Sequence, residues 1–174
     1  MTAADRPDPV EHRMEKTYEV SATPEAVWEA IATAEGISAW MVPTHLDPQV
    51  GGQVSFDHGG FRLTGVVTGY EPNRRFAYEE PWPIAAGQPI PEGMLPWFAS
   101  IGASLSQVDH DLASITPLAT EFLVESGSGG SCVIRIVSSS YGTGSDWENE
   151  FFTEMVAGWI ELLDKLAVRL DEAA

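Results

Sequence analysis

The sequence contains a single cysteine, Cys132, so the chain cannot form an internal disulfide. It has no run of 18 or more apolar residues, the minimum for a membrane-spanning helix. Its first residues, MTAADRPDPVEHR, are polar and acidic and lack the apolar core of a secretory signal. A lone cysteine fits a reducing compartment. We therefore expect a cytoplasmic protein that is not inserted in a membrane.

Basic residues are also scarce. Nine lysines and arginines stand against 26 acidic residues, and the formal net charge is −17. Such a charge repels phosphate backbones and anionic lipid surfaces. We therefore expect no nucleic-acid partner.

The sequence lacks the motifs of metal and hydrolase sites. No two histidines have the i, i+4 spacing of a helical metal site, and neither Cys-x-x-Cys nor His-Glu-x-x-His occurs. The serines at 138–140 lack the Gly-x-Ser-x-Gly turn of a serine hydrolase. We predict no metal, no cofactor and no assigned catalytic residue. The histidines are His12, His45, His58 and His110.

Residue patterning predicts the order of elements. Residues 11–20 alternate between apolar and polar side chains, as in a strand with one wet face. A helix is expected next, with Thr23 as its N-cap, Pro24 at its first position and Gly36 at its end. A short helical turn should follow over 37–41. Further strands are predicted at 50–56, 61–70, 74–80, 118–126 and 131–141, and a long helix at 147–170.

This order predicts an α+β fold in one domain, residues 11–174, after a flexible tail at 1–10. Residues 81–118 interrupt it, because they are rich in proline and show no usable period. Their aromatic residues, Trp82 among them, favour burial over disorder. We interpret this segment as an insertion and a candidate lid.

The predicted terminal helix places Gly158 directly before Trp159. Glycine in a helix interior costs about 1 kcal/mol relative to alanine. We expect Gly158 to let a neighbouring group approach the helix, and Trp159 to reach into the space that the sheet encloses. Spacings of three and four define the sheet-facing stripe: Phe152, Met155, Trp159, Leu163, Leu166 and Leu170.

Four segments carry a family resemblance. TPEAVWEAIATAEGISAWM resembles the first helical segment of the SRPBCC superfamily, and VGGQVSF resembles its Gly-Gly strand. GVVTGYEPNRRFAYEE and EMVAGWIELLDKL resemble its Glu-Pro and Gly-Trp motifs. Together they resemble the branch named for homology to the activator of the heat-shock protein 90 ATPase. The resemblance covers 11–80 and 119–170 and implies the START-like, or helix-grip, fold, in which a curved antiparallel sheet wraps around the last helix.

Two features depart from the family pattern. The segment VSSSYGTGS has no histidine where the family shows a His-Ser-Gly-Phe-like turn, and 81–118 is longer than expected. The eukaryotic activator also pairs this kind of domain with a separate N-terminal domain. We find one domain here, so the resemblance does not extend to stimulation of an ATPase.

The resemblance implies a cavity between sheet and last helix that binds hydrophobic ligands. The chain is rich in aromatic residues, and aromatic side chains line many small-molecule sites. We therefore predict a small apolar or amphipathic ligand. The candidate ligand-binding residues are Trp40, Met41, Phe56, Phe61, Trp82, Trp97, Phe98, Phe122, Tyr141, Phe151, Met155 and Trp159.

Two other hypotheses stay open. One is a cyclase- or dehydratase-type enzyme, in which His45, His110 or Tyr141 supplies an acid or base in the apolar pocket. The sequence Asp-His-Asp at 109–111 is more typical of a surface loop than of a catalytic group. The other is an interaction module, either a homodimer or a chaperone partner, that uses exposed aromatic residues of 81–118.

Overall fold

The computed structural model describes residues 8–82 and 87–173. Seven antiparallel strands form one sheet in the order β1-β7-β6-β5-β4-β3-β2. The first seven residues of the predicted tail lie outside the described residues. The strands are β1 (Val10–Val20), β2 (Thr44–Leu46), β3 (Gln53–Asp57), β4 (Arg62–Glu71), β5 (Arg75–Glu80), β6 (Leu118–Ser126) and β7 (Cys132–Gly142). The helices are α1 (Pro24–Ala32), α2 (Ala34–Trp40), α3 (Leu95–Ser100), α4 (Leu105–Leu112) and α5 (Asp146–Glu172), with short 3-10 turns η2 (Glu92–Met94) and η3 (Ser128–Gly130).

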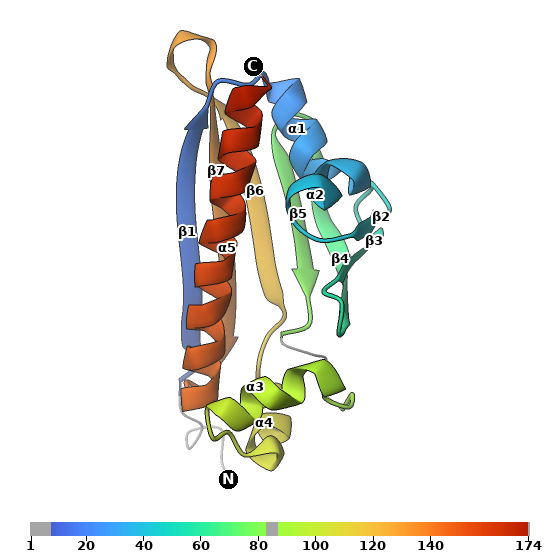
Figure 1. Cartoon of the computed structure of the whole chain (residues 1–174), viewed down its shortest axis with the longest axis vertical. Helices are drawn as coiled ribbons and strands as arrows, with labels where there is room; N and C mark the ends of the chain where they lie inside the picture. The colour runs from blue at the N-terminus through green and yellow to red at the C-terminus, as the bar shows by residue number, and fades with distance from the viewer. Residues whose placement is uncertain (1–7, 83–86, 174) are drawn as a thin grey trace.

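The curved sheet wraps around α5, which runs along its concave face (Figure 1). Helices α1 and α2 cover the same face beside the C-terminal half of α5. Helices α3 and α4 lie at the opposite end, near the start of α5. The predicted α+β helix-grip fold is confirmed.

The predicted order of strands is confirmed, with one omission and one shifted boundary. Strand β2 was not predicted, because three residues are too few to show a period. The first helix ends at Ala32 instead of at Gly36. Thr33 starts the next helix, since its hydroxyl accepts a hydrogen bond from the Gly36 backbone N–H at 3.0 Å.

The prediction that 81–118 has no regular structure was wrong at α3 and α4. Ser104 caps α4 by accepting a hydrogen bond from the Gln107 backbone N–H. Val108 and Leu112, four residues apart, are buried on one face of this short helix. Residues 83–86 of the segment lie outside the described residues. Tertiary burial therefore fixes two helices that are too short to show a clear period.

The predicted stripe of α5 faces the sheet. Phe152, Trp159, Leu163, Leu166 and Leu170 are buried, and Met155 is half-buried. The ring of Trp159 lies 6.4 Å from that of Trp40 and 6.2 Å from that of Phe122, centroid to centroid. Trp159 therefore helps to fill the space between sheet and helix.

Gly158 does not have the predicted role. A Cβ atom at this position would meet no neighbouring atom within 4 Å, and the residue is exposed. No close approach therefore requires glycine here. Gly158→Ala should raise the free energy of unfolding by about 0.5–1 kcal/mol, the difference in helix propensity. Urea denaturation followed by circular dichroism measures it, and a loss of stability would show that the position has a contact partner.

Candidate functional site

An apolar cavity opens between the η2–α3 segment and the first half of α5. Its volume is about 300 Å³. Four of the predicted ligand-binding residues line it: Phe61, Trp97, Phe151 and Met155. The sequence prediction missed three others, which are Gly93, Met94 and Glu154.

Aromatic packing builds the wall of this cavity. The ring of Trp97 meets that of Phe151 edge to face, with centroids 5.5 Å apart. The indole N–H of Trp97 donates a hydrogen bond to the Glu154 carboxylate, which ties α3 to α5. Gly93 lies against Gly60, where a Cβ atom would come within 3.2 Å of the Gly60 Cα atom. This close approach joins the turn before β4 to the segment before α3.

A second group of predicted residues surrounds the middle of the core instead. The space among them is too narrow to admit a water molecule. The large aromatic rings, including those of Trp40 and Trp159, fill the interior that the family resemblance suggested as a cavity. The predicted residues in this group are Trp40, Met41, Phe56, Phe122 and Trp159.

The remaining three predicted residues belong to neither group, although Trp82 and Phe98 both pack against Trp147. Phe98 is a fully buried residue of α3 and belongs to a second apolar cluster with Trp147. Tyr141 is 45% exposed on β7 and belongs to neither group. Trp82 is buried between the two regions, with its ring 5.2 Å from that of Phe151.

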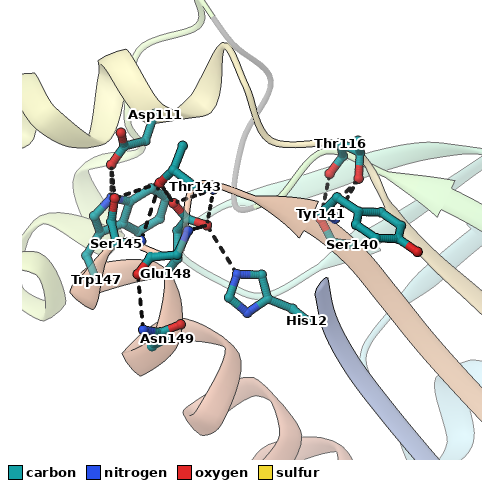
Figure 2. Close-up of polar contacts among 11 residues, drawn as sticks. His12, Asp111, Thr116, Ser140, Tyr141, Thr143, Ser145, Trp147, Glu148 and Asn149 are labelled. Atoms are coloured by element: carbon teal, nitrogen blue, oxygen red, sulfur yellow. Dashed lines mark hydrogen bonds and ion pairs between the residues drawn. The ribbon is translucent and has the colours of Figure 1, made fainter. Parts of the chain in front are cut away.

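A buried polar junction joins β1 to the start of α5 (Figure 2). The Nε2 atom of His12 lies 3.1 Å from Oε1 of Glu148, and both side chains are buried. The Glu148 carboxylate also accepts hydrogen bonds from the backbone N–H groups of Thr143 and Gly144. Gly142 is required here, because a Cβ atom would lie 2.1 Å from Oε1 of Glu148.

Asp111 forms a second junction, between α4 and α5 (Figure 2). Its Oδ2 atom accepts hydrogen bonds of 2.7 Å from the indole N–H of Trp147 and from the hydroxyl of Ser145. The surface-loop interpretation of Asp-His-Asp was therefore wrong for Asp111, which is 3% exposed. Asp109 and His110 lie on the surface as expected, but on the helix α4 and not in a loop.

The concave face of the sheet becomes polar toward α3. Buried polar side chains occur on neighbouring strands at this end, and several bond to one another. The hydroxyls of Thr120 and Ser138 lie 3.0 Å apart, and that of Ser140 donates to the Thr116 carbonyl. The buried polar residues of the concave face here are His12, Glu80, Thr120, Ser138 and Ser140.

Glu80 and Trp82 differ from the other polar groups at this end. Within residues 8–82 and 87–173, neither Oε2 of Glu80 nor Nε1 of Trp82 has a hydrogen-bond partner, although both atoms are buried. Burial raises the pKa of Glu80 to about 8, so the carboxyl group is largely protonated at neutral pH. Burial and the nearby Glu80 carboxyl raise the pKa of Tyr78 well above its ordinary value.

The three residues proposed as an acid or base lie on the surface. His45, His110 and Tyr141 are all exposed, and none lines the apolar cavity. In the described part of the chain, no group of three or more histidine, cysteine or acidic side chains could hold a metal ion. None of the described helices combines the length and hydropathy needed to cross a membrane.

The fold and the terminal Gly-Trp helix agree with a family comparison. The family model described as activator of Hsp90 ATPase homolog 1-like protein matches residues 21–171. The chain belongs to this family. Of the described elements, the match spans every strand except β1 and every helix, apart from the last residue of α5. Among curated proteins, the comparison finds no match.

Several solved structures share the fold of this Hsp90-activator-like chain. The Aha1 dimer from Colwellia psychrerythraea is 17% identical, with a TM-score of 0.61 over 91% of this chain and 96% of that one. A Mesorhizobium loti protein is also 17% identical, with a TM-score of 0.66 over 93% and 98%. A Staphylococcus aureus protein of unknown function is 14% identical, with a TM-score of 0.63 over 95% and 96%. At these identities the likeness establishes the fold.

Proposed function

We propose that the protein binds a small, neutral, apolar or amphipathic molecule in the cavity between α3 and α5. The observation that carries this proposal is the open apolar cavity of about 300 Å³, which falls at the lower end of the range for small-molecule sites. Aromatic and methionine side chains form most of its wall. Methionine is flexible and polarisable, so Met94 and Met155 can adapt to ligands of differing shape.

The charge of the site favours a neutral ligand over an anion. Among the described residues, Glu154 is the one charged residue that lines the cavity, and the chain as a whole carries a net charge of −17. Both would repel an anionic ligand. Because Glu154 accepts a hydrogen bond from Trp97, its carboxylate is already held against the wall.

The proposed position differs from the one that the sequence suggested. Trp159 and its neighbours close the middle of the core, so the proposed site lies between α5 and the former candidate lid. The interaction-module hypothesis relied on exposed aromatic residues of 81–118, where Trp82 and Phe98 are buried and Trp97 is half-buried.

Filling the cavity should weaken binding. Met155→Trp places a larger side chain in the wall, so the affinity for the neutral fluorescent probe N-phenyl-1-naphthylamine should fall by about tenfold or more, equivalent to ~1.4 kcal/mol. Val168→Trp is the matched control, because Val168 is exposed near the other end of α5. Fluorescence titration measures the affinity, and native mass spectrometry of the purified protein identifies any molecule that it retains. Equal affinity in wild type and Met155→Trp would exclude this site.

A further inference from the structure

Two buried polar groups close to the proposed ligand site have no hydrogen-bond partner among residues 8–82 and 87–173. Glu80 is 7% exposed and Trp82 is 3% exposed. Oε2 of Glu80 and Nε1 of Trp82 have no partner among the described residues. A buried polar group without a hydrogen bond costs about 1–3 kcal/mol. Such groups are rare in native proteins and call for a physical explanation.

Their position relates them to the cavity. Trp82 contacts Phe151 edge to face, and Phe151 lines the cavity, so the indole lies one side chain away from it. Glu80 precedes Trp82 by two residues, at the end of β5. Its side chain lies on the same face of this strand as the buried Tyr78.

Glu80 and Trp82 differ from the buried polar residues around them. The other buried polar groups nearby are paired, as His12 is with Glu148 and Thr120 is with Ser138. The indole N–H is a donor only, and a protonated carboxyl group donates one hydrogen bond through its O–H. Both groups can therefore donate to an oxygen atom that a ligand brings.

We propose that Glu80 and Trp82 form the polar end of the ligand site, reached when the half-buried Phe151 side chain rotates, and that they bind a carbonyl or hydroxyl oxygen of an otherwise apolar molecule. This inference rests on the proposed function and makes it more specific. The cavity accepts the apolar body of the molecule, and the two donors select for its oxygen. A ligand without that oxygen leaves both groups unpaired and so binds less tightly.

The test compares two probes of nearly equal shape, 2-acetylnaphthalene and 2-ethylnaphthalene. Wild type should bind the ketone roughly three- to tenfold more tightly, the value of one or two net hydrogen bonds. The infrared C=O stretch of the bound ketone should move to lower frequency than in an apolar solvent. Quenching of tryptophan fluorescence measures both affinities, and the infrared measurement requires no variant.

Variants identify the donors. Glu80→Leu and Trp82→Phe should each reduce the preference for the ketone, whereas Glu80→Gln should keep it, because an amide N–H still donates. Circular dichroism checks that each variant is folded. For a variant that does not fold, the infrared shift in wild type still decides the question.

The outcomes separate the inference from the proposed function. A ketone preference that Glu80→Leu removes and Glu80→Gln retains supports the inference. Equal affinities with an unshifted C=O stretch would overturn it and assign the two groups to internal water, while leaving the proposed function in place. If neither probe binds, the proposed function fails, and the inference fails with it.

Discussion

Glu80→Gln is expected to remove most of the loss of stability that the wild-type protein shows between pH 5 and pH 8. The carboxyl group of Glu80 is buried, and burial raises its pKa from 4.5 to about 8. Above pH 4.5 the unfolded chain releases this proton, while the folded protein retains it. The stabilising contribution is therefore fully present below about pH 4.5 and is lost as the pH rises through 8.

The magnitude follows from proton linkage. While only the folded state holds the proton, the free energy of unfolding falls by about 1.4 kcal/mol per pH unit. From pH 5 to pH 8 the loss is on the order of 3 kcal/mol, a large fraction of the stability of a typical domain. Glutamine does not titrate, so Glu80→Gln should show no such slope. Urea denaturation at half-unit pH steps measures it.

A neighbouring residue provides the control. Glu79 is exposed on the opposite face of the same strand, so Glu79→Gln should retain the wild-type slope. The pKa of His58 is lowered, chiefly because its packing against Phe61 removes part of the ring from water. A histidine with a lowered pKa makes the folded protein more stable as the pH rises, whereas Glu80 makes it less stable. The contribution of His58 is the same in wild type and Glu80→Gln, so it cancels when the two proteins are compared. If the free energy of unfolding had the same pH dependence in wild type and Glu80→Gln, Glu80 would be ionised in the folded protein.

The sequence predicted the long-range architecture because its signals repeat. Residues 11–20 alternate over a whole strand, and the stripe on α5 recurs over five turns, so each signal is averaged over many residues. Short elements contain too few residues for a repeating pattern to be recognised. Strand β2 has three residues and α4 has eight, and tertiary contacts decide their structure. For α4, the pairing of Asp111 with Trp147 across 36 residues is such a contact.

The candidate site was predicted less well for the same reason. Aromatic residues can be counted in the sequence, but whether they fill a space or line it depends on their side-chain packing. Trp159 and Trp97 look alike in the sequence, yet one closes the core and the other forms a cavity wall. Glu80 was not singled out, since a strand residue among charged neighbours is typically exposed. Its spacing could have indicated burial, because Glu80 follows Phe76 and Tyr78 at intervals of two residues and so shares their face of β5.

Trp159→Ala is expected to have the largest effect on stability of any single substitution in the middle of the core. Trp159 is 6% exposed and packs against Trp40 and Phe122. Truncation of a buried tryptophan to alanine costs about 3–5 kcal/mol, because apolar contacts are lost and a cavity remains. Thermal and urea denaturation measure the loss. A change below about 1 kcal/mol would mean that the core collapses around the smaller residue.

The same substitution should also create a binding site that the wild type lacks. The interior around Trp159 now admits no water molecule, and an apolar cavity left by a large side chain can accept an apolar ligand of matching size. Indole should therefore raise the melting temperature of Trp159→Ala by more than that of Trp159→Phe, in which the phenyl ring fills most of the space and only the cavity between α3 and α5 is open. A ligand that binds only the folded state stabilises it by mass action. Equal stabilisation of Trp159→Ala and Trp159→Phe would show that indole binds only at a site that both variants share, and that the space vacated by Trp159 does not accept it.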